Sequence, residues 1–99
     1  MQRRSSPGGV PRDLQSVRSR IDELDEGLIE LIAARVQLAR EAAEVKKASG
    51  LGPVDLAREA RVVRRASGLA REKGVEPELM RDVYWRLIGL SRWAVGERR

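Results

Sequence analysis

Four basic residues, Arg18, Arg35, Lys46 and Arg58, stand where a positive charge requires an explanation. An apolar stripe with alternating steps of three and four residues runs through residues 14–45, and Arg35 occupies one of its positions. A guanidinium on such a face either extends to water along its aliphatic stem or meets a fixed anion. Arg35 is therefore a candidate for binding an anionic molecule, with a solvent-reaching side chain as the alternative.

Two other basic residues are placed to join Arg35. Lys46 lies 11 residues later, about three helical turns, so both side chains project from the same side of a helix. Arg58 precedes Glu59 in the first turn of a second expected helix, where the helix dipole disfavours a positive charge. A bound anion would compensate Arg58, whereas the alternative is an ordinary solvated side chain.

Arg18 lies too far along the chain to join this group within one molecule. It precedes Lys46 by 28 residues, or about 42 Å along a straight helix. In an antiparallel dimer, the start of one long helix lies beside the far half of the other, so Arg18 of the partner subunit would complete the site. The alternative is a surface ion pair with Asp22, which would contribute little.

Composition limits the chemistry and the partners. The chain has no Cys and no His, which excludes a thiol nucleophile, disulfides, the usual zinc ligands and a histidine acid or base. The net charge of +5, from 20 Lys and Arg against 15 Asp and Glu, favours anionic partners. No long apolar run is present, so we expect no membrane span and a cytoplasmic location.

The basic side chains must be positioned by helices, and the first expected helix is long. Residues 1–11 are rich in Ser, Gly and Pro and are expected to form a tail, and residues 12–99 a single helical domain. The first helix runs to about Ser49, where the segment 50–53 stops it. Its apolar stripe comprises Leu14, Val17, Ile21, Leu24, Leu28, Leu31, position 35, Leu38, Ala42 and Val45.

Such a helix, about 55 Å long, exceeds a compact domain of this size, whose radius of gyration is about 13 Å. The apolar stripe would therefore be exposed in a lone chain. A second copy of the chain would cover it, which predicts an obligate homodimer with intertwined helices.

Two medium helices follow, and no strand pattern is present. Asp55 can cap a helix from Leu56 to about Lys73, and Gly74 ends it. Pro77 then suits the first turn of a third helix. The expected inward residues are Val62, Val63, Ala66 and Leu69 in the second helix and Leu79, Met80, Val83, Tyr84, Leu87 and Ile88 in the third. The predicted fold class is all-α, with one long and two medium helices.

The order and spacing of these residues resemble those of the all-helical chorismate mutases over residues 14–95. Helical Arg-x-x-x-Asp patterns are common, so the resemblance depends on the whole set. Its members are Arg18, Ile21, Asp22, Leu24, Asp25, Arg35, Lys46, Pro53, Asp55, Arg58, Glu59 and Ser91.

The resemblance implies a homodimer with two sites that rearrange chorismate to prephenate, without cofactor or metal. It implies that Arg35 and Arg18 of the partner subunit bind the two substrate carboxylates. Lys46 would donate to the ether oxygen and Ser91 to a carboxylate. Asp55, or its backbone, and Glu59 would contact the ring hydroxyl, and Arg58 would add positive charge.

Position 95 departs from the family pattern. The family carries Gln or Glu there, one turn after the serine, and this residue contacts the ether oxygen, whereas the chain has Val95. Arg92 or Glu97 reaching into the site instead is one explanation. A weak mutase that a partner enzyme of the shikimate route completes is another. A different substrate is the third, for example isochorismate cleaved to salicylate and pyruvate, or an amino analogue of chorismate.

Two alternatives of other classes stay open at this point. A non-catalytic helical dimer could bind nucleic acid through Arg58, Arg61, Arg64, Arg65, Arg71 and Lys73. That surface does not explain Arg35, and acidic residues are mixed through the chain, so we expect no nucleic-acid partner. A mutase-like domain that only binds a regulatory aromatic metabolite is the second alternative, and Val95 is its best support.

Overall fold

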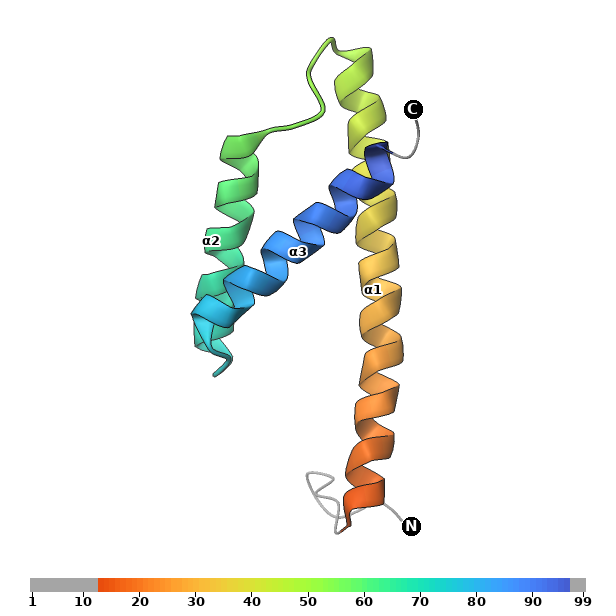
Figure 1. Cartoon of the computed structure of the whole chain (residues 1–99), viewed down its shortest axis with the longest axis vertical. Coiled ribbons are helices and arrows are strands. Elements are labelled where there is room, and N and C mark those ends of the chain that lie inside the picture. Colours follow the sequence, from red (N-terminus) through yellow and green to blue (C-terminus); the bar gives the residue numbers. More distant parts are fainter. Residues whose placement is uncertain (1–12, 97–99) are drawn as a thin grey trace. The chain divides into compact units, whose positions relative to one another are not determined.

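The computed structural model describes residues 13–96 as three helices: α1 (Leu14–Ala48), α2 (Leu56–Glu72) and α3 (Pro77–Gly96) (Figure 1). Residues 13–96 contain no strand, which confirms the all-α prediction with one long and two shorter helices. The expected tail at 1–11 lies outside the described residues. Within 13–96 no helix is both long enough and apolar enough to cross a membrane.

The helix ends follow from single residues. Asp55 has extended backbone angles and its carboxylate accepts a hydrogen bond of 3.0 Å from the backbone N–H of Arg58, which caps α2. Gly50 and Gly74 have φ values of +74° and +77°, which L side chains rarely adopt, and they follow the ends of α1 and α2. Pro77 is the first residue of α3. These boundaries confirm the predicted ones to within a residue or two.

The chain divides into two compact units, Met1–Ala33 and Ala34–Arg99, and α1 contributes to both. In the first unit, every stripe residue from Leu14 to Leu31 is exposed. The second unit contains the end of α1, together with α2 and α3. The stripe is exposed there too, with Leu38 at 62% and Val45 at 66%. A lone chain therefore leaves the whole apolar stripe in contact with solvent, as predicted.

The core of the second unit lies in the hairpin of α2 and α3. Its buried residues are almost all small: Val63, Ala66, Ser67, Ala70, Ile88 and Ala94. Small side chains let two helices approach closely. In Figure 1, α3 runs back from the end of α2 toward the C-terminal part of α1, and Arg35 of α1 binds Ser91 of α3.

In α1, the half-buried residues of the second unit include Val36, Ala39 and Ala43, which lie beside the apolar stripe and not on it. Two predictions about the facing of α2 and α3 were wrong. In α3, Leu79 and Val83 are exposed rather than inward. Leu79 lies nine residues, or about half a turn in angle, from the buried Ile88, so the two project from opposite sides of the helix. Leu69 of α2 is also exposed, at 42%. The most apolar stripe on a helix is thus not the stripe that its own chain covers.

Two glycine substitutions test these backbone assignments. Gly74→Ala should lower the free energy of unfolding by about 1 kcal/mol, because φ at this position is +77°. Gly68→Ala, inside α2, should raise it by about 0.5 to 1 kcal/mol, because a Cβ there meets no atom within 4 Å. Urea unfolding followed by circular dichroism measures both, and equal effects would contradict the assignment.

Candidate functional site

A pocket of about 180 Å³ lies within the second unit, and all three helices contribute to it. Arg35 comes from α1, Arg58 and Arg65 from α2, and Tyr84 from α3. Val62, Ala66 and Leu69 of α2 complete the lining. The pocket therefore combines three guanidinium groups with an apolar floor.

Arg35 is half-buried, and neutral groups hold it. Its Nη1 donates a hydrogen bond of 3.0 Å to Oγ of Ser91, and its guanidinium carbon lies 5.7 Å from the centre of the Tyr84 ring. No carboxylate of residues 13–96 forms an ion pair with it. The guanidinium is thus oriented by the protein but not neutralised, which favours an anion-binding role over a solvent-reaching side chain.

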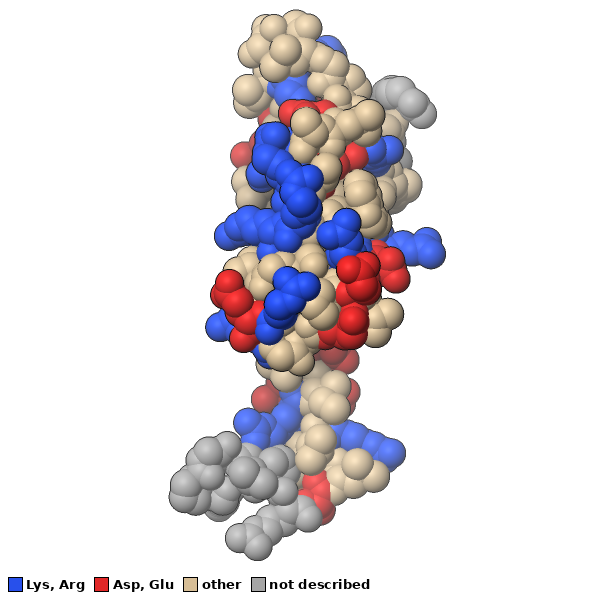
Figure 2. Space-filling model, turned by 90° about the vertical axis from the view of Figure 1, so that its left-hand side faces the viewer, with Lys and Arg blue, Asp and Glu red and all other residues tan. Residues whose placement is uncertain are grey.

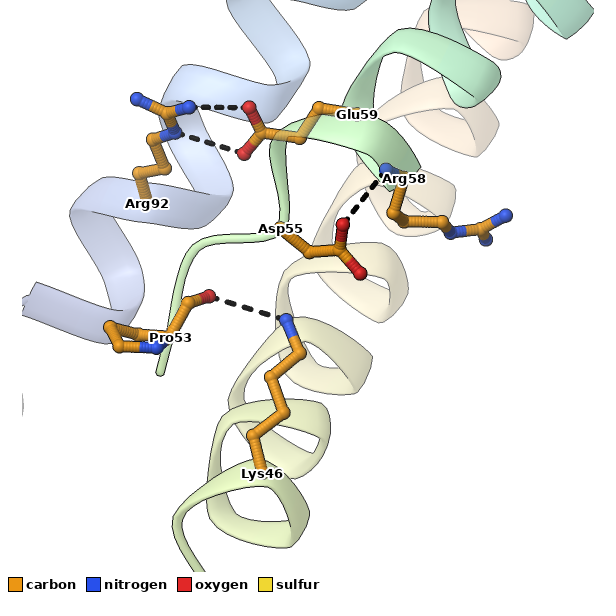
Figure 3. A network of polar contacts seen from close by, with 6 residues as sticks. All are labelled: Lys46, Pro53, Asp55, Arg58, Glu59 and Arg92. Atoms are coloured by element: carbon orange, nitrogen blue, oxygen red, sulfur yellow. Dashed lines mark hydrogen bonds and ion pairs between the residues drawn. The ribbon is translucent and has the colours of Figure 1, made fainter. Parts of the chain in front are cut away.

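Lys46 fixes the loop between α1 and α2. Its Nζ donates a hydrogen bond of 3.2 Å to the carbonyl oxygen of Pro53 (Figure 3). Lys46 is half-buried, and an ammonium group has two further protons to donate. The lysine can therefore hold the loop and bind a ligand atom at the same time.

The start of α2 carries one oriented acid and one unpaired base. The side chain of Glu59 is only 15% exposed, and Arg92 of α3 binds both of its oxygens, through Nε at 3.0 Å to Oε2 and through Nη2 to Oε1 (Figure 3). This pairing raises the pKa of Arg92, first through the hydrogen bond and then through charge attraction. Arg58, next in the chain to Glu59, is exposed and forms no ion pair within residues 13–96.

The second unit thus contains most of the residues predicted for the site. Arg35 contacts Ser91, and Lys46, Asp55, Arg58 and Glu59 lie in the polar network of Figure 3. Val95 is half-buried at the end of α3. Arg18 is exposed and belongs to the first unit, so its part in the site stays a prediction.

Sequence reasoning missed three contacts of this region. Tyr84 was assigned to the core, yet its ring lies under Arg35 in the pocket. Arg65 lines the pocket seven residues after Arg58, a spacing that places both on one side of α2. The sequence offers Arg92 as a residue that reaches into the site in place of Val95. It does not predict the contact of Arg92 with Glu59, because no residue spacing relates side chains on two different helices.

The pocket is electropositive because its cations lack acidic partners. Within residues 13–96, Arg81 pairs with Glu78 and Arg92 pairs with Glu59, and neither arginine lines the pocket. Figure 2 shows blue Lys and Arg side chains gathered on the face on which α2 lies, with red acidic groups beside them. A concave site with unpaired positive charge concentrates anions. The arrangement suits a small molecule with more than one negative charge.

Residues 17–93 match the family described as chorismate mutase type II. The chain belongs to this family. It is also 36% identical to the T-protein of Enterobacter agglomerans over 76 residues, which cover 77% of the chain. The chain spans about a fifth of the length of that relative, 20%. These matches confirm the resemblance and favour neither the nucleic-acid alternative nor the lyase alternative.

A substitution at Ser91 tests the contact that orients Arg35. Ser91→Ala should lower the free energy of unfolding by about 1 kcal/mol, because a part-buried hydrogen bond is lost. The loss should disappear when Arg35→Ala is already present, since the bond is then absent in both proteins. Ser19→Ala, at an exposed position of α1, is the control, and urea unfolding measures all four variants. Additive effects of Ser91→Ala and Arg35→Ala would contradict the contact.

Proposed function

We propose that this chorismate mutase domain converts chorismate to prephenate in the pocket of Arg35 and Arg58. The observation that carries the proposal is the half-buried Arg35, which Ser91 and Tyr84 hold in an electropositive pocket without a carboxylate partner. Chorismate has two carboxylates, so it matches this surplus of positive charge. The isomerisation also needs no nucleophile, which agrees with a chain lacking Cys and His.

The reaction is a rearrangement within one molecule. The ether C–O bond breaks while a C–C bond forms, and negative charge develops on the ether oxygen. Two tasks therefore fall to the protein: to hold the flexible dianion in its compact conformer and to place positive charge at that oxygen. Arg35 would bind one carboxylate through its guanidinium, and Ser91 would donate its hydroxyl proton to a carboxylate while accepting the Arg35 bond.

Lys46 is proposed as the donor to the ether oxygen. The lysine already binds the carbonyl of Pro53, so closing of the loop and placement of the ammonium group are linked. Glu59 and Asp55, or the backbone of Asp55, would contact the ring hydroxyl, with one carboxylate accepting its hydrogen bond, and Arg58 would add positive charge. Val95 cannot donate a hydrogen bond, so Lys46 would act at the ether oxygen alone.

The same proposal includes a homodimer. The apolar stripe of α1 is exposed over its whole length, and a second copy would cover it. Arg18 of the partner subunit would then bind the second carboxylate. We also propose that the intrinsic activity is weak and that another shikimate-route enzyme completes it, which Val95 supports. The proposed cytoplasmic location rests on the sequence expectation alone.

Chorismate consumption by the purified protein tests the activity directly. The wild-type chain should form prephenate, and Arg35→Ala should reduce kcat/KM by about 100-fold to 1000-fold, because a preorganised charge contact is lost. Arg86→Ala, at an exposed position of α3, should leave turnover unchanged. Identification of the product by mass and absorbance separates the outcomes: salicylate and pyruvate formed from isochorismate, without prephenate from chorismate, would replace the mutase with a lyase.

Mixing of two inactive variants tests the shared site. Arg18→Ala and Arg35→Ala homodimers should each be nearly inactive, because each of their sites lacks one arginine. In a mixed dimer one site regains both arginines and the other loses both. Random exchange should therefore restore about a quarter of the wild-type activity, since half of the dimers are mixed and half of their sites are intact. Absence of recovery after confirmed exchange would place Arg18 outside the site.

A further inference from the structure

The carboxylate of Glu59 lies at the start of α2 with little access to water. Its side chain is 15% exposed, and burying a carboxylate costs free energy unless hydrogen-bond donors bind it. Arg92 supplies two donors from α3, and its own side chain is 49% exposed. The pair thus orients the acid while the base keeps about half of its surface in water.

The two-bond geometry fixes where the Glu59 oxygens lie. A planar guanidinium that binds both oxygens of a carboxylate sets the rotation as well as the position of that group. The bond joins residues that are 33 positions apart, from the first turn of α2 to the last turns of α3. Arg92 follows Ser91, which binds Arg35. Two consecutive residues of α3 therefore orient one base and one acid of the site.

The pairing also compensates the charge of Glu59. In Figure 3 the contacts drawn for the Glu59 carboxylate are with Arg92 alone. A carboxylate without this partner would add negative charge at the start of α2 and repel a dianion. With Arg92 bound to it, its charge is compensated, and within residues 13–96 Lys46 and Arg58 form no ion pair.

We infer that Arg92 is a positioning residue of the chorismate site, which orients Glu59 and compensates its charge. This inference rests on the proposed function. Arg92 acts through Glu59 and not through contact with the reacting atoms. Its loss should therefore affect binding of the dianion more than the chemical step.

Steady-state kinetics with chorismate tests this role. Arg92→Gln should raise KM about tenfold and change kcat less, because a charged hydrogen-bonded pair is lost. Arg92→Lys should recover part of the loss, since an ammonium group retains the charge but not the planar fork. Arg81→Gln is the matched control, because Arg81 pairs with Glu78 on the same helix outside the pocket, and its KM should equal that of the wild type.

The decisive comparison uses Glu59→Gln. If Arg92 acts through Glu59, Arg92→Gln should change KM by less than twofold once Glu59→Gln is present. An unchanged KM in Arg92→Gln, or a full tenfold effect in the Glu59→Gln background, would overturn the inference while leaving the mutase activity intact. A wild-type chain that leaves chorismate unconverted would instead overturn the proposed function. The Kd of chorismate would then be measured by calorimetry for the same variants. Absence of binding, or an unchanged Kd in Arg92→Gln, would overturn the inference as well.

Discussion

Positive charge without acidic compensation is the constraint on which the proposed site depends. Arg35, Arg58 and Arg65 line one pocket, and the groups that hold Arg35 are a hydroxyl and an aromatic ring. Such neutral partners orient a guanidinium without reducing its charge. Like charges in one pocket oppose folding, so the hairpin core of α2 and α3 must offset them. We therefore interpret the arrangement as a feature of the proposed site that folding tolerates.

The limits of the helices were predictable because each depends on a local residue. Asp55 can accept a backbone hydrogen bond, Gly50 and Gly74 allow positive φ, and Pro77 has no amide proton to lose. The unusual position of Arg35 was also evident, since one charge interrupts an otherwise apolar stripe. Each of these features depends on one residue and its near neighbours in the chain. Sequence patterns predict such local features directly.

The rotation of each helix about its axis was less predictable. The strongest apolar stripe of α1 faces solvent in the lone chain, and the half-buried face beside it contains alanines and one valine. Arg35 lies at the border of both faces. Its place in the apolar stripe predicts a half-buried side chain, although the face that its own chain covers is the neighbouring one. The Arg92–Glu59 pair was not predictable from the sequence for a similar reason. The pair depends on how α3 is rotated relative to α2, and no residue spacing within either helix determines that rotation.

The small residues of the hairpin core have a consequence for the precision of the site. Ala66, Ala70 and Ala94 have no side-chain rotamers to lose on folding, so packing α2 against α3 orders few internal rotations. An interface of this kind has few alternative arrangements, because an alanine cannot adopt a second conformer to accommodate a shift. Ser91 and Arg92 lie beside Ala94 on the same helix. The hairpin core therefore has low configurational entropy. This restricts how far Ser91 and Arg92 can move relative to their partners, Arg35 and Glu59.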